Sequence, residues 1–104
     1  MYKLTSIQTR PSTSVDFWMP ENPAVLNGYL DHFRSTYVVT GKLLDVNSTV
    51  SANGLELTTD IIWDGEESAN TWKQDARTVS EFVAPRDAYF ASAGITTVFN
   101  GETI

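Results

Sequence analysis

The feature that most constrains this chain is an Asn-Gly pair at positions 53 and 54, flanked on both sides by alternating apolar and polar residues. Asn and Gly tolerate positive φ angles, so the pair predicts a two-residue type I′ turn between antiparallel strands. A turn centred there places opposite each other the residues whose numbers add up to 107. We therefore expect a β-hairpin of defined register around "STVSANGLELTTDIIW", residues 48–63.

The two faces of this hairpin differ in polarity. One face carries four pairs, of which three are apolar at both positions: Val50–Leu57, Ser48–Thr59, Val46–Ile61 and Leu44–Trp63. The other face carries mostly polar pairs: Thr49–Thr58, Asn47–Asp60, Asp45–Ile62 and Leu43–Asp64. A slip of one residue would exchange the two faces, so the pattern specifies the register strongly. The apolar face requires a covering layer.

The first half of the chain predicts a strand, a loop and a helix. Residues 2–10 are rich in β-branched and aromatic residues, as strands are, and the loop 11–23 holds three of the four prolines. Asn22 suits the N-cap of a helix, and Pro23 suits its first position. The apolar residues of one helical face follow: Leu26, Leu30, Phe33 and Tyr37. Gly28 inside this helix predicts close packing there, because it costs about 1 kcal/mol relative to alanine.

Helical periodicity returns after the hairpin. Asp64 and Glu67 have the spacing of a capping box. Apolar residues then repeat at three- and four-residue intervals: Ala69, Trp72, Ala76, Val79 and Val83. Pro85 predicts an interruption, after which a second helical segment over 85–94 ends at Gly94. A short strand over 95–99 completes the pattern.

The resulting order of elements, β-α-β-β-α-β, predicts an α+β, ferredoxin-like fold with a four-stranded antiparallel sheet and its helices on one face. A chain of 104 residues is sufficient for one domain, which we expect to cover residues 1–104. A hydrophobic core of this size is only marginally large, which favours association between subunits.

Charge and composition exclude several classes of function. The formal net charge is -6, and the seven Lys and Arg residues are scattered, so we expect no nucleic-acid partner and no membrane surface. There is no cysteine, which removes disulfides and thiol chemistry. We see neither an apolar signal segment nor an apolar run of the ~20 residues that cross a bilayer. The expected location is the cytoplasm.

The element order, the chain length and the runs "IIWDGEESANTWKQDA" and "RDAYFASAGI" resemble the dimeric α/β-barrel superfamily, which includes antibiotic-biosynthesis-monooxygenase-like domains. The resemblance implies a homodimer in which two subunits pack sheet against sheet to form the barrel. The interface would lie on the second hairpin face, with Leu43, Asn47, Thr49, Thr58, Asp60 and Ile62. It also implies a pocket between sheet and helices for a small apolar or aromatic ligand.

Five residues are candidates for lining such a pocket: Tyr29, His32, Trp63, Trp72 and Arg86. His32 is the only histidine, and a histidine near its ordinary pKa can act as a general acid or base at neutral pH. The alternative is a partly exposed histidine hydrogen-bonded to a neighbour. Trp63 and Trp72 are either an aromatic wall for a planar ligand or core residues with satisfied N–H groups.

Two functions follow from these candidates. The first is a non-catalytic module that binds a small molecule or assembles as a dimer. The alternative is a cofactor-independent monooxygenase-like enzyme. Such relatives stabilise a substrate carbanion with Asn, Trp, Tyr and Arg, and the resemblance implies that role for Trp63, Tyr29 and Arg86.

No metal or cofactor is expected. The segment "DIIWDGEE" begins like a calcium loop, but Ile62 stands where an oxygen ligand is needed and Thr71 where a bidentate Glu is needed. One histidine and no cysteine leave too few ligands for a transition metal, unless carboxylates dominate the site. Haem-degrading relatives carry a histidine on the second long helix, and this chain has none there.

Overall fold

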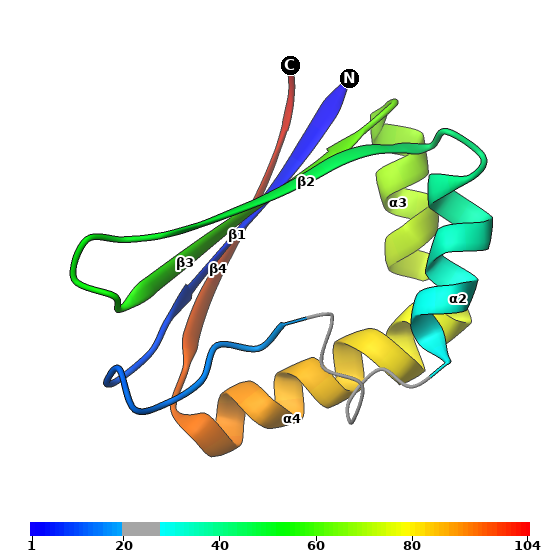
Figure 1. Ribbon diagram of the computed structural model, residues 1–104. Coiled ribbons are helices and arrows are strands. Elements are labelled where there is room, and N and C mark those ends of the chain that lie inside the picture. The colour runs from blue at the N-terminus through cyan, green and yellow to red at the C-terminus, as the bar shows by residue number, and fades with distance from the viewer. Residues whose placement is uncertain (20–27) are drawn as a thin grey trace.

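The computed structural model describes residues 1–19 and 28–104, and these form a four-stranded antiparallel sheet with its helices on one face (Figure 1). The strands are β1 (Tyr2–Thr9), β2 (Leu43–Val50), β3 (Glu56–Trp63) and β4 (Thr96–Thr103). They lie side by side in the order β2-β3-β1-β4. The helices are α2 (Tyr29–Phe33), α3 (Glu66–Gln74) and α4 (Ala84–Ala93), with the π-helical turns η1 (Arg34–Val38) and η2 (Thr78–Val83). This confirms the predicted ferredoxin-like fold class.

The register of the hairpin is confirmed from Asp45 to Val50, with Val46 opposite Ile61 and Val50 opposite Leu57. The turn differs from the prediction, because Gly54 has a positive φ of 75° and Asn53 does not. The Gly54 N–H donates to the Ser51 carbonyl at 2.9 Å, so a four-residue connection replaces the type I′ turn. The register survives because the Ser51 N–H bonds the Glu56 carbonyl, also at 2.9 Å.

The start of β2 departs from the predicted pairing. A bulge between Leu43 and Asp45 places Leu43, and not Leu44, opposite Trp63. Leu43 is therefore buried on the helix side, while Leu44 is 49% exposed. The extra residue of a bulge reverses which side chain faces the core, so the predicted pairs Leu44–Trp63 and Leu43–Asp64 are wrong.

The described part of the predicted first helix contains α2, which spans Tyr29–Phe33. Gly28 precedes Tyr29 with a φ of +87°, a left-handed conformation that does not continue a helix. Apart from its chain neighbours, no atom of the described residues lies within 4 Å of a Cβ placed on Gly28, so the predicted close packing there stays a prediction. Asn22, Pro23 and Leu26 lie outside the described residues. Tyr37 is buried, and Leu30 and Phe33 pack against the core, as the stripe predicts.

The second helix breaks at Asp75 and not at Pro85. Its N-cap is Gly65, without a side-chain hydrogen bond, so the predicted cap by Asp64 is wrong. At Asp75 the backbone leaves the helical region (φ -59°, ψ 124°), and η2 then continues through Pro85 into α4. Figure 1 shows α3 and α4 running in clearly different directions. Gly94 ends α4 with φ 71°, as predicted.

The break at Asp75 changes which residues face the sheet. Thr78 and Phe82 are buried, while Val79 is 48% exposed and Ala76 is exposed. The predicted stripe is therefore correct for Ala69 and Trp72, which are buried, and wrong for Ala76 and Val79. An uninterrupted helical period cannot describe two segments with a break between them.

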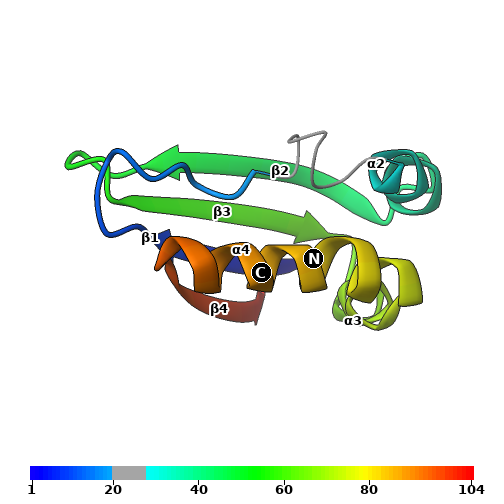
Figure 2. The same cartoon turned by 90° about the horizontal axis from the view of Figure 1, so that it is seen from below.

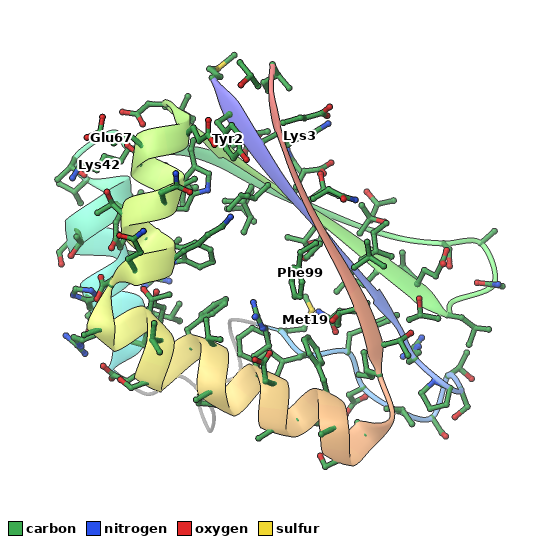
Figure 3. All side chains as sticks on the ribbon, turned by 180° about the vertical axis from the view of Figure 1, so that it is seen from behind. Tyr2, Lys3, Met19, Lys42, Glu67 and Phe99 are labelled. Atoms are coloured by element: carbon green, nitrogen blue, oxygen red, sulfur yellow. The ribbon has the colours of Figure 1, made fainter. Side chains whose placement is uncertain are left out.

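The segment 11–19 is held against the helix-facing side of the sheet. The Gln8 amide is buried on β1 and donates to the Trp18 carbonyl at 2.9 Å, while its oxygen accepts the Trp18 N–H at 2.9 Å. Figure 3 shows Met19 and Phe99 on the helix side of the sheet and Lys3 on the opposite side. In Figure 2, α4 is drawn in front of β1, and α2 lies beside the start of β2.

The difference in burial between Phe82 and Val79 on η2 gives a direct test of the helix break at Asp75. We expect Phe82→Asp to reduce the free energy of unfolding by more than about 3 kcal/mol, because it places a carboxylate in the core. Val79→Asp introduces the same group on an exposed position, and we expect it to cost less than about 1 kcal/mol. Urea denaturation of both variants measures the difference. Equal losses in the two variants would contradict the observation that Phe82 is buried and Val79 is exposed.

Candidate functional site

A cavity of about 300 Å³ lies between the helix-facing side of the sheet and the helices η2 and α4, and we call it the sheet–helix cavity. Five aromatic side chains from four parts of the chain line it: Trp18, Trp72, Phe82, Phe90 and Phe99. Leu4, Leu57 and Ile61 add aliphatic surface from β1 and β3. The cavity is partly open, and its size and apolar lining are those of small-molecule sites.

A second cavity of about 390 Å³ lies between β2 and α2, and we call it the β2–α2 cavity. Tyr29, Phe33 and Leu43 belong to its lining. Both cavities share five residues: Val46, Thr59, Ile61, Trp72 and Phe82. The side chains of Trp72 and Phe82 therefore lie where the two spaces adjoin.

A buried hydrogen-bond chain fixes Trp72 between the two cavities. The Trp72 Nε1–H donates to the Tyr29 hydroxyl at 2.9 Å, and the Tyr29 hydroxyl lies 2.7 Å from Thr78 Oγ1. Because the Tyr29 oxygen already accepts the indole N–H, its own proton is available to Thr78. Burial raises the pKa of Tyr29, although both hydrogen bonds oppose the shift. Tyr29 is therefore a neutral phenol that orients Trp72.

His32 belongs to a polar cluster at the break in the second helix. His32 Nε2 and the Tyr37 hydroxyl each lie 2.6 Å from Asp75 Oδ2, and Asp75 Oδ1 accepts the Arg77 N–H at 2.9 Å. Burial alone would raise the pKa of Asp75, but the hydrogen bonds from Tyr37, His32 and Arg77 outweigh it and lower the pKa to about 2. Burial and the neighbouring Asp75 raise the pKa of Tyr37. This cluster joins η1 to the α3–η2 junction.

Arg86 brings a positive charge to the sheet–helix cavity. Its side chain is 17% exposed, and its guanidinium carbon lies 4.7 Å from the centre of the Phe99 ring. The centres of Phe82 and Phe90, four residues away on either side, lie 5.8 and 5.9 Å from it. Arg86 Nε also bonds the neighbouring Asp87 carboxylate at 3.2 Å. A cation held among aromatic faces is favourable, and it can still receive an anion.

The structure separates the five candidate residues predicted from the sequence. Trp72 lines both cavities, Arg86 lines the sheet–helix cavity, and Tyr29 lines the β2–α2 cavity. His32 and Trp63 belong to neither lining. Trp63 is fully buried, with its ring centre 5.5 Å from that of Trp72 and 5.7 Å from that of Tyr37.

Several lining residues were missed by sequence reasoning. Thr78, Phe82 and Phe90 were not predicted; together with the predicted Arg86 they recur every four residues and form the cavity-facing side of η2 and α4. This spacing was a signal in the sequence, but the continuous stripe through Val79 and Val83 obscured it. No local signal identified Trp18, which reaches the cavity only because Gln8 holds its backbone.

Among residues 1–19 and 28–104, no group of three or more His, Asp or Glu side chains is placed to hold a metal ion. Within the same residues, no helix has the length and apolar character needed to cross a membrane.

No protein-family model matches the sequence, and no curated protein matches it. Solved structures do match in fold. A Deinococcus radiodurans protein, provisionally described as an antibiotic biosynthesis monooxygenase, is 12% identical with a TM-score of 0.59, covering 100% of this chain and 92% of the other. Two dimeric ferredoxin-like proteins from uncultured marine organisms are each 10% identical, with TM-scores of 0.60 and 0.50. They cover 100% of this chain and 94% and 96% of the others.

These similarities show that the chain shares the ferredoxin-like fold of these proteins. The TM-scores establish the fold, whereas identities of 10% to 12% do not carry a function over to this chain.

The lowered pKa of Asp75 predicts a specific pH dependence of stability. The ionised carboxylate is favoured by folding, so its contribution is present above the ordinary pKa near 3.8 and is lost as the pH falls through about 2. We expect Asp75→Asn to reduce the free energy of unfolding by about 2 kcal/mol at pH 7. The deficit should shrink between pH 4 and pH 2, as measured by urea denaturation. A deficit that stays constant over this range would contradict the assignment.

Proposed function

We propose that this protein binds a small, largely apolar or aromatic molecule in the sheet–helix cavity. The observation that carries the proposal is the convergence of Trp18, Trp72, Phe82, Phe90 and Phe99 around about 300 Å³ of space. Aromatic side chains provide large apolar contact areas for flat ligands. Of the residues predicted from the sequence, Trp72 and Arg86 contact the ligand in this proposal. Tyr29 orients Trp72 through its hydroxyl.

The cofactor-independent monooxygenase is the alternative function. Its support is the fold shared with the Deinococcus radiodurans protein and the presence of Arg86 at the cavity. This enzymatic function requires that four residues line one pocket: Tyr29, His32, Trp63 and Arg86. His32 is instead bonded to Asp75, and the Tyr29 hydroxyl is bonded to Trp72 and Thr78. Because these hydrogen bonds already occupy His32 and the Tyr29 hydroxyl, we favour a binding function over a catalytic one.

We also propose that the protein is a homodimer through the outer face of the sheet. All described helices lie on the other face (Figure 1). The outer face carries Ile7, Ile62 and Val98 among polar residues, with Ile7 opposite both Thr58 and Val98. Two of the structurally similar proteins are described as dimeric. Leu43, which the sequence assigned to this interface, points to the helix side and is excluded from it.

The ligand proposal predicts which tryptophans respond to a neutral aromatic probe. We expect 2-naphthalenemethanol to shift the indole N–H signals of Trp18 and Trp72 in ¹H–¹⁵N NMR spectra. The Trp63 signal should move several-fold less, because Trp63 lies outside the cavity lining. Single Trp→Phe variants assign the three signals. Uniform shifts, or none at saturating probe, would contradict the proposed site.

The assembly proposal predicts a mass near twice the chain mass of 11.5 kDa in sedimentation equilibrium at micromolar concentration. A stable interface of this kind buries about 1,200 Å² or more in total. We expect Ile7→Glu to dissociate the dimer, because it places a charge on the outer face, on a strand that lies between β3 and β4. Val79→Glu adds the same charge to an exposed site on the helix layer and should leave the dimer intact. A wild-type monomer would refute the dimer.

A further inference from the structure

We infer that the ligand of the sheet–helix cavity is an organic anion, such as an aromatic carboxylate, whose charged end meets Arg86. This inference rests on the proposed function and specifies its ligand. The first support is the distribution of charge. The chain has 13 acidic and 7 basic residues, yet the described residues that line the cavity include Lys73 and Arg86 and neither Asp nor Glu. A cavity that is positive within a negative protein selects anions by electrostatics.

The second support is the environment of Arg86. Its side chain is largely removed from water, and removing a cation from water is costly unless an anion compensates. Asp87 is its one ion-pair partner among the described residues, and this carboxylate bonds Nε alone and is itself 59% exposed. The remaining guanidinium N–H groups have no hydrogen-bond partner among residues 1–19 and 28–104. A guanidinium presents paired donors that match the two oxygens of a carboxylate.

The third support is an unpaired donor in the same lining. Trp18 is 4% exposed, and its indole Nε1–H has no hydrogen-bond partner among the described residues. The same holds for the Nε1–H of Trp63, but Trp63 lies in the core outside the cavity lining. Buried polar groups in proteins nearly always have partners, so such a donor marks a place where an acceptor is missing. Both unsatisfied groups at this cavity, on Trp18 and Arg86, are donors. A ligand that bears acceptor oxygens complements them, whereas a cationic ligand does not.

The shape of the cavity defines the rest of the ligand. Its volume of about 300 Å³ and its aromatic lining accommodate a body the size of two fused rings. Phe99 lies against the Arg86 guanidinium, so the apolar and charged parts of the site are adjacent. An amphipathic molecule with a flat apolar body and one carboxylate satisfies both parts.

A matched pair of probes tests this inference. 2-Naphthoate and 2-naphthalenemethanol share the same ring system and differ in charge. Isothermal titration calorimetry of the wild-type protein should show at least tenfold tighter binding of 2-naphthoate. In Arg86→Gln we expect this preference to fall to less than about twofold, with the affinity for the neutral alcohol unchanged. Arg86→Lys keeps the charge and should keep part of the preference.

Arg77→Gln is the control variant, because Arg77 is exposed, pairs with Glu81 and does not line the cavity. It should leave the preference for 2-naphthoate intact. Circular dichroism establishes that each variant is folded. If the alcohol binds as tightly as 2-naphthoate, or if Arg86→Gln retains the full preference, the inference is overturned and the cavity proposal stands. If neither probe binds, both are overturned.

Discussion

The carboxylate of Asp75 stabilises the point at which the helical layer changes direction. It accepts hydrogen bonds from the Tyr37 hydroxyl, His32 Nε2 and the Arg77 N–H, and so joins three separate parts of the layer. Without a partner set of this kind, a backbone that leaves the helix at Asp75 would expose unsatisfied groups at both helix ends. The change of direction separates α3 from η2 and α4. The cavity lies beneath these later segments.

The aromatic residues that wall the cavity depend on the same junction. Trp72 lies three residues before Asp75, and its indole is fixed by Tyr29, whose hydroxyl also contacts Thr78 three residues after it. Phe82, Arg86 and Phe90 then follow on one side of η2 and α4. The buried core around Trp63 supports these residues. The indole N–H of Trp63 in this core has no hydrogen-bond partner among the described residues, and neither does that of Trp18 at the cavity.

The sequence predicted those features that local chemistry determines. The alternation around Asn53 and Gly54 is a period-two pattern with one apolar face, and it gave the correct register of the hairpin. The bulge between Leu43 and Asp45 could not be predicted from that pattern, because it inserts only a single residue. The break at Asp75 was missed for a different reason: it depends on His32 and Tyr37, which lie 43 and 38 positions away in the chain. The five candidate residues do not meet at one pocket, because tertiary contacts divide them between the core, the polar cluster at Asp75 and the two cavities.

The most direct measurement of the central claim is a crystal structure of the protein soaked in 6-bromo-2-naphthoate, with the bromine located by its anomalous scattering. Our account predicts one strong bromine peak inside the sheet–helix cavity, with the carboxylate on Arg86 and the rings against Trp72 and Phe99. A structure in which α4 packs flat on the sheet and fills this space, or in which bromine peaks occur only at the surface, would contradict it.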